Sequence, residues 1–395
     1  MDRRFFLKGL GVMGCSAAAH PWMTTLTLAQ GAPALGENRL VVIILRGAMD
    51  GLDVVQPRGD RDYAALRPSL SQPAAIDLDG FFALHPALGD LMPLWQAGEL
   101  AFAHATSTPY RDKRSHFDGQ DLLEAGTGMD VAPGAVRDGW LNRMLQGLPG
   151  VTAETAYAIG REAVPLLAGP APVRNWTPEQ RLTLSAQGRL LLEQVYHDDA
   201  LFRDAAMEAF DLTEAGAARP KREAAEVAGL ADIDRLVDFA AVRLVADTRI
   251  AAFSLAGWDT HKAQGRELSR SLTRLQRTIL RMKDQLGPDV WGRTTVMAMT
   301  EFGRTARENG TQGTDHGTGG AMVMAGGAIR GGKVYGAWPG LSEAALYDRR
   351  DLMPTMDVRA FAAHAMQGLY GMDSGLLEAT VFPGLQMGKS PGILL

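Results

Sequence analysis

Cysteine is almost absent from this chain, since Cys15 is the only one among 395 residues. A chain without cysteine beyond position 15 can form no internal disulfide and no thiolate metal site. Its stability must therefore come from a hydrophobic core, and any metal site must use His, Asp and Glu. Cys15 itself ends Val12-Met13-Gly14-Cys15, which only loosely resembles a lipoprotein cleavage box.

Long apolar runs and a strong net charge are also missing. Beyond residue 34, no segment is long and apolar enough to form a transmembrane helix. The net charge is −5, and loss of the +2 carried by the first 34 residues would make it −7. This acidic balance excludes nucleic acid as an expected partner. Apolar residues form 46% of the chain and charged residues 22%, which is typical of a globular protein.

The N-terminus has the pattern of an export signal. Arg3-Arg4-Phe5-Phe6-Leu7-Lys8 places an arginine pair before an apolar doublet, and a short Gly/Ala-rich stretch follows. Small residues near Ala29 and Ala34 mark a cleavage zone. We interpret residues 1–34 as a twin-arginine signal peptide. The twin-arginine translocase is then a partner during export, and the mature protein is periplasmic or otherwise extracytoplasmic.

Short apolar runs alternate with helical patterns along the rest of the chain. Residues 40–45, 100–105, 157–159, 250–256, 294–300 and 321–325 are predicted as buried strands. Residues 85–97, 117–125, 139–148, 262–286 and 357–370 are predicted as helices. This alternation indicates an α/β fold, a three-layer α/β/α sandwich with a mostly parallel central sheet.

One segment interrupts the alternation. Residues 178–247 consist almost entirely of helix-forming residues, with a break near Ala217 to Pro220. We interpret them as a helical insertion or cap on a single α/β domain that spans residues 35–395.

Polar side chains gather where the predicted strands end. In an open parallel sheet, ligands bind outside the carboxyl ends of the strands. Four predicted strands are followed, and one is preceded, by carboxylates, imidazoles or hydroxyls. These segments are Arg46-Gly47-Ala48-Met49-Asp50-Gly51, the loop from Tyr110 to His116, Gly257-Trp258-Asp259-Thr260-His261, Glu301-Phe302-Gly303-Arg304-Thr305 and Thr314-Asp315-His316-Gly317.

Oxygen and nitrogen ligands of this kind suit a divalent metal ion. Asp259 and His261 are two residues apart, so in an extended segment both side chains face the same way. Asp, Glu and His together favour zinc, manganese or a similar ion. Two such ions would clamp the attacking and leaving oxygens of a phosphoryl or sulfuryl ester.

Three further residues are candidates for catalysis or anion binding. Ser115 stands at a predicted helix start, where it is either a nucleophile, an N-cap or both. Arg46 and Arg304 either hold the peripheral oxygens of the anion or form ordinary ion pairs. Among the other histidines, His85 is interpreted as structural, and His104 as a core residue or a support for the site.

The order of these motifs resembles the bacterial domain-of-unknown-function family number 1501. The resemblance runs from about Leu40 to the C-terminus and rests on Arg46-Gly-x-x-Asp50-Gly-Leu, Ser115-His116-Phe117, Trp258-Asp259-Thr260-His261, Glu301-Phe302-Gly303-Arg304-Thr305 and Thr314-Asp315-His316-Gly317. That family is related to the alkaline phosphatase and sulfatase superfamily. The resemblance thus implies an α/β/α sandwich with one or two metal ions at the strand ends.

The resemblance also implies roles for single residues. Ser115 falls near the superfamily's nucleophile, with His116 beside it. The metal ligands are expected to be Asp50, Asp259, His261, Glu301 and His316, with Asp315 as a further ligand or as the group that orients His316. Two departures weaken the second metal site: one residue instead of three separates Asp259 from His261, and Glu301-Phe302-Gly303 replaces Asp-His-Gly. One ion, or none, is therefore an open alternative.

Three functions follow from these patterns. The first is an exported metal-dependent hydrolase that acts on a small-molecule or envelope-polymer ester of phosphate or sulfate. The second is a non-catalytic binding or assembly protein of the cell envelope on the same fold. The third is a transferase that moves a phosphoryl-type headgroup onto an envelope polymer and uses the same residues.

Overall fold

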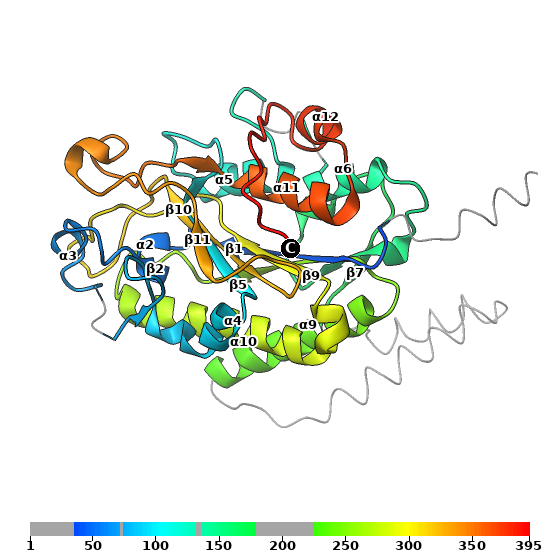
Figure 1. Cartoon of the computed structure of the whole chain (residues 1–395), viewed down its shortest axis with the longest axis horizontal. Helices are drawn as coiled ribbons and strands as arrows, with labels where there is room; N and C mark the ends of the chain where they lie inside the picture. Colours follow the sequence, from blue (N-terminus) through cyan, green and yellow to red (C-terminus); the bar gives the residue numbers. More distant parts are fainter. Residues whose placement is uncertain (1–34, 72–73, 132–135, 137, 179–224) are drawn as a thin grey trace, which may run out of the picture.

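A central sheet with helices on both faces forms the body of the protein (Figure 1). The structure is a computed structural model that describes residues 35–71, 74–131, 136, 138–178 and 225–395. The sheet consists of β1 (Arg39–Arg46), β5 (Leu100–Ser107), β6 (Ala156–Ile159), β7 (Arg174–Trp176), β8 (Ile250–Ala256), β9 (Thr294–Met299), β10 (Gly320–Ala325), β11 (Lys333–Tyr335) and β12 (Met356–Asp357). A small second sheet contains β2 (Val55–Gln56), β3 (Ile76–Asp77) and β4 (Ala83–Leu84).

The large sheet is mostly parallel, as the sequence predicts. Its strand order is β11-β5-β10-β9-β1-β8-β6-β7, and β12 also pairs with β5. In the centre, β1 pairs in parallel with both β8 and β9. Helices cover both faces of β1, so the run from Leu40 to Leu45 is fully buried, which explains its continuous apolar sequence. All six predicted strands are confirmed, and the fold is the expected three-layer α/β/α sandwich.

Strand β10 is the exception, because it runs antiparallel to both of its neighbours, β5 and β9. Its first residue, Gly320, pairs with Thr106 near the end of β5. The loop that enters β10 therefore lies at the same edge as the loops that leave β1, β5, β8 and β9. This reversal brings residues before β10 to the carboxyl ends of the parallel strands.

Helices form the two outer layers (Figure 1). One layer contains α5 (His116–Ala125), α6 (Trp140–Gln146), α11 (Val358–Tyr370) and α12 (Ser374–Leu376). The other contains η1 (Pro86–Leu91), α4 (Met92–Gln96), α9 (Ala225–Val245) and α10 (Gln264–Trp291). Alternate residues of β1 face the two layers: Val42 belongs to the same core cluster as Trp140, and Val41 belongs to the other, with Leu272.

Part of the predicted helical insertion is visible. Helix α9 covers its last third and packs on α10, where Arg277 and Arg281 pair with Asp234 and Asp238. Residues 179–224 of the insertion and the predicted signal peptide, 1–34, lie outside the described residues. Within the described ranges, no helix combines the length and the apolar composition needed to cross a membrane.

A buried ion pair holds two short helices to the sheet edge. Asp50 caps α2 (Gly51–Val54), and Arg67 follows α3 (Tyr63–Leu66). The guanidinium donates Nη1 to Asp50 Oδ2 at 2.7 Å and Nη2 to Oδ1 at 3.1 Å, and both side chains are at most 1% exposed. Arg67 also donates to the carbonyl oxygens of Thr305 and Ala306, so every strong hydrogen-bonding group in this pair has a partner.

We predict that Asp50→Asn lowers the free energy of unfolding by about 3–5 kcal/mol, because it leaves the charge of Arg67 buried and uncompensated. Urea unfolding measures this difference. The matched control is Asp234→Asn, which breaks a partly exposed pair with Arg277 and should cost less than about 1 kcal/mol. Equal losses in the two variants would contradict the prediction.

Two histidines in this part of the molecule, His85 and His104, are buried and neutral. His85 accepts from the Ala87 amide at Nδ1 and so begins η1, which confirms its structural interpretation. His104 bonds the Val55 carbonyl through Nε2 at 2.9 Å and stacks on Phe82, so it is a core residue. Burial lowers the pKa of each imidazole to about 4.

His104 should make the protein less stable as the pH falls. An unfolded chain takes up a proton on this residue near pH 6.5, whereas the folded protein does so only near pH 4. Stability is therefore lost as the pH drops through this window, by up to about 1.4 kcal/mol per pH unit for one imidazole. The variant His104→Gln, which keeps a donor for Val55, should show a correspondingly shallower loss in urea unfolding between pH 7 and 4.

Comparison of the wild type with His104→Gln separates the effect of His104 on stability from that of Asp53, which has the opposite sign. Burial, aided by the Asp50 charge, raises the pKa of Asp53 to about 7, so Asp53 favours folding as the pH falls. That contribution is the same in wild type and His104→Gln and cancels in the difference. Parallel pH profiles for the two proteins would refute the assignment of a low pKa to His104.

Candidate metal site

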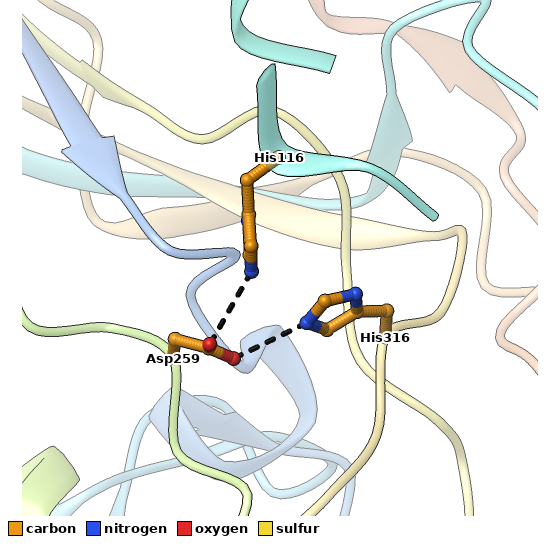
Figure 2. A group of neighbouring side chains, drawn as sticks. All are labelled: His116, Asp259 and His316. Carbon is orange, nitrogen blue, oxygen red and sulfur yellow. Dashed lines mark hydrogen bonds and ion pairs between the residues drawn. The ribbon is translucent and has the colours of Figure 1, made fainter. Parts of the chain in front are cut away.

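Three histidines and one aspartate converge at the carboxyl edge of the sheet. His116 is the first residue of α5, after β5; Asp259 and His261 follow β8; and His316 precedes β10. Figure 2 shows His116, from the start of α5 above, and His316, at the right, each with a ring nitrogen directed at the Asp259 carboxylate. The four residues come from three segments that are distant in the sequence, and the antiparallel course of β10 is what adds His316.

All three imidazoles present Nε2 to Asp259. The distances from Nε2 to a carboxylate oxygen are 3.5 Å for His116, 3.3 Å for His316 and 3.0 Å for His261. The Nε2 atoms of His261 and His316 are 3.0 Å apart. We call these four residues the histidine cluster.

Each imidazole is oriented by an acceptor at its other nitrogen. Nδ1 of His116 lies 2.7 Å from Glu301 Oε1, and Nδ1 of His261 lies 3.3 Å from Asp315 Oδ1. Nδ1 of His316 lies 2.9 Å from the carbonyl oxygen of Arg114. An acceptor at Nδ1 fixes the tautomer with a free Nε2 and is the usual arrangement behind metal-bound histidines.

The donor atoms fit one divalent cation. One nitrogen or oxygen each from His116, Asp259 and His316 lie within 4.8 Å of one another. Neighbouring donors around a tetrahedral zinc ion with ligand distances of about 2.0–2.1 Å stand about 3.3 Å apart, close to the 3.5 and 3.3 Å that separate Asp259 from Nε2 of His116 and of His316. His116 Nε2 is buried and, besides its 3.5 Å contact with Asp259, has no hydrogen-bond partner among the described residues, as expected of an atom that can bind a metal.

The charges in the cluster are strongly coupled. Hydrogen bonds to Asp259 and Glu301 raise the pKa of His116 to about 9. Burial opposes ionisation of Asp259, but hydrogen bonds from His116, His316 and Arg304 outweigh it and hold the pKa of the carboxyl well below its usual range. Because His116 must lose its proton to bind a cation through Nε2, protons and cations compete for this site.

Glu301 lies behind the histidine cluster rather than in it. Its side chain is fully buried and accepts hydrogen bonds from the amides of Gly47 and Ala48 as well as from His116. Phe302, the next residue, stacks on the His116 ring. These contacts are those of a residue that orients His116, and the expected role of Glu301 as a metal ligand stays a prediction.

Asp50 is also absent from the cluster. Both of its carboxylate oxygens are engaged by Arg67, and Gln264 Nε2 donates to Oδ2 at 2.7 Å. The predicted role of Asp50 as a metal ligand does not fit this arrangement, because the oxygens that a metal needs are already bound. Asp315 was expected to bind the metal or to orient His316. Its carboxylate contacts His261 instead, so the histidine that it orients is a different one.

The two arginines predicted to hold an anion have other partners. Arg46 pairs with the buried Glu124 at 2.8 Å and with Glu162 at 3.2 Å, so the ion-pair alternative fits it. Arg304 is completely buried and donates to Asp259 Oδ1 at 2.7 Å and to the Thr314 carbonyl.

Ser115 occupies the N-cap position of α5. Its hydroxyl accepts from the amide of Asp118 at 3.4 Å, and its own amide donates to the Tyr110 hydroxyl at 2.7 Å. These contacts fit the N-cap alternative, while a nucleophilic role remains a prediction. Because Ser115 precedes His116, the cap also fixes where the first ligand begins.

No pattern in the sequence reveals which residues support the cluster from a distance. Gln120 donates to Glu301, Asn309 donates to Asp315, and Thr314 accepts from Arg304. Side chains of these types are common on any loop, and only their position in space links them to the site.

Several solved structures show a distant likeness to this chain. PsFucS1 sulfatase from Pseudoalteromonas sp. has a TM-score of 0.42 at 12% identity over 96% of this chain and 76% of that one. A protein of the alkaline phosphatase superfamily from Vibrio parahaemolyticus has a TM-score of 0.36 at 13% identity over 77% and 64%. The C-terminal periplasmic domain of EcEptC from Escherichia coli, in complex with Zn, has a TM-score of 0.34 at 10% identity over 74% of each chain.

Comparisons at the level of sequence place the chain in a family. No curated protein matches it. The family model described as "Protein of unknown function (DUF1501)" matches residues 37–377, which include all four residues of the histidine cluster. The chain therefore belongs to the DUF1501 family.

Proposed function

We propose that this protein is an exported, metal-dependent hydrolase of phosphate or sulfate esters. Its cation is held by His116, Asp259 and His316. The observation that carries the proposal is the convergence of three imidazole Nε2 atoms on one carboxylate, each imidazole being fixed at Nδ1 by an acceptor. Oriented imidazoles around a carboxylate at strand ends are typical of a metal centre.

The class of substrate rests on the motif order. The order of the motifs resembles that of a family related to the alkaline phosphatase and sulfatase superfamily. The N-terminal pattern supports action outside the cytoplasmic membrane. A divalent cation in such a site, zinc or manganese by its ligand types, polarises an ester oxygen and lowers the pKa of water. The substrate is then an ester that reaches the protein in that compartment, either a small molecule or an envelope polymer.

His261 has the geometry of a proton-transfer group. Its side chain is 43% exposed, compared with 23% for His116 and 18% for His316. Asp315 holds the proton on Nδ1, which leaves Nε2 to accept a proton from water or to deliver one to the leaving oxygen. This role departs from the expectation that His261 is a ligand, and the two roles are separable by experiment.

Two alternatives use the same residues. A non-catalytic binding protein is the first alternative, and in it Ser115 would act only as the N-cap of α5. A headgroup transferase differs from a hydrolase only in the acceptor. Product analysis with an added alcohol separates the transferase, and the variants below separate the binding protein.

The ligands and the proton-transfer group should respond differently to substitution. We expect the wild type to contain about one equivalent of zinc or manganese by elemental analysis and His316→Ala to contain almost none. His261→Ala should retain the metal yet lower kcat on 4-nitrophenyl phosphate or sulfate by about 10²- to 10⁴-fold. The variant His364→Ala, which removes an imidazole in α11, is the control.

Three outcomes would contradict these assignments. A wild type that takes up no metal, even with excess ions, would overturn the hydrolase and leave the envelope binding protein. Loss of metal in His261→Ala would make His261 a ligand. Full metal content in His316→Ala would move the site elsewhere.

Glu301 should affect metal affinity through His116. We predict that Glu301→Gln weakens zinc binding by about 10- to 100-fold in competition with a chelator, because a neutral amide holds the imidazole less firmly. Gln120→Ala, which removes a different partner of the same carboxylate, should have a smaller effect. Unchanged zinc affinity in Glu301→Gln would show that the carboxylate does not orient a ligand.

A further inference from the structure

A groove of about 550 Å³ lies beside the histidine cluster. Three loops form it: the turn before α3, the loop between β9 and β10, and residues 341–350. Asp315 lines the groove and also bonds His261, so the groove opens next to the cluster. Its position makes it a natural extension of the site.

The groove carries four carboxylates, from Asp62, Glu308, Asp315 and Glu343, and four arginines. Arg61, Arg307, Arg349 and Arg350 line it. Arg350 is engaged, because it donates to the His316 carbonyl oxygen and pairs with Asp351. The other three guanidinium groups extend from exposed residues.

These three arginines have weak partners or none. Arg61 lies 3.8 Å from Asp62, and Arg349 lies 3.6 Å from Glu343, with both arginine side chains at least 80% exposed. Such exposed pairs contribute little and exchange readily with another anion. Arg307 is exposed and forms no ion pair with the described part of the chain.

The more buried carboxylates of the groove are already occupied. Glu308 accepts from the backbone amides of Ser69 and Leu70. Asp315 accepts from Asn309 and orients His261. The carboxylates that contact the rim guanidinium groups are Asp62 and Glu343, at 3.8 and 3.6 Å, and neither holds its arginine firmly.

The backbone that carries Arg349 is held in a strained turn. Asp348 and Arg349 have φ angles of 48° and 53°, in the left-handed region that side chains rarely adopt. Hydrogen bonds between the backbones of Tyr347 and Asp351 close this turn. Consecutive strained residues persist where the surrounding structure fixes them, often at ligand sites.

We propose that the groove binds a second anionic group of the substrate, so that the protein acts on polyanionic esters. This inference rests on the proposed function, since the cluster would take the ester that is cleaved. Arg307, Arg349 and Arg61 would recognise a further phosphate or sulfate of the same molecule. The planar guanidinium group matches the oxygens of such groups through paired hydrogen bonds.

Calorimetric titration with two probes tests this proposal. Sucrose octasulfate carries many sulfates on one molecule, and inorganic sulfate carries one. We expect the wild type to bind the octasulfate at least about 10-fold more tightly than sulfate. Arg307→Ala/Arg349→Ala should lose this difference while its metal content and its affinity for inorganic sulfate stay unchanged.

A matched control variant, together with the metal content of the wild type, shows whether the groove arginines cause the octasulfate binding. Arg330→Ala removes an exposed arginine beyond the other end of β10 and should bind the octasulfate like the wild type. Equal octasulfate affinity in the wild type and the double variant would overturn the proposal, as would an equal loss in Arg330→Ala. If the wild type holds no metal but still binds the octasulfate through these arginines, the proposed anion site in the groove is supported and only the proposed hydrolase activity is contradicted.

Discussion

The buried pair between Asp50 and Arg67 is the interaction on which the geometry of the site depends. Gln264, at the start of α10, donates its amide to Asp50 and accepts from the Thr314 hydroxyl, both at 2.7 Å. That hydroxyl oxygen accepts from Nε of Arg304 at 3.1 Å, and Arg304 reaches the aspartate of the histidine cluster. A continuous buried network thus supports the cluster from below and ties α2, α3 and α10 to the loop that enters β10.

The fold could be predicted largely from local pattern. A strand covered on both faces must be apolar throughout, so a run such as residues 250–256 is recognisable as a buried strand. A long helix such as α10 is recognisable from its apolar period. The antiparallel course of β10 could not be predicted, because its residues would be equally buried in either direction. Short elements such as β7, β11 and β12 were missed, since two or three residues carry no period.

The site was predicted in its position and only partly in its roles. The strand-end rule places His116, Asp259 and His261 together because a parallel sheet delivers its loops to one edge, whereas His316 joins them through the reversal of β10. It does not distinguish a carboxylate that faces the cluster from one that lies behind it. Asp50 and Glu301 follow strands just as Asp259 does, and their roles are decided by Arg67 and His116, partners that no spacing in the sequence reveals.

The histidine cluster joins loops beside β5, β8 and β10, with β9 and β1 between them in the sheet. Asp259 and His316 alone are 57 residues apart in the chain. In a protein whose only cysteine is Cys15, a cation held there would serve as the cross-link that secreted proteins usually obtain from disulfides. Unlike a disulfide, this link is reversible, and at a free metal concentration of 100 Kd it would add about 2.7 kcal/mol to stability. The lifetime of the folded protein would then follow the metal supply of its compartment.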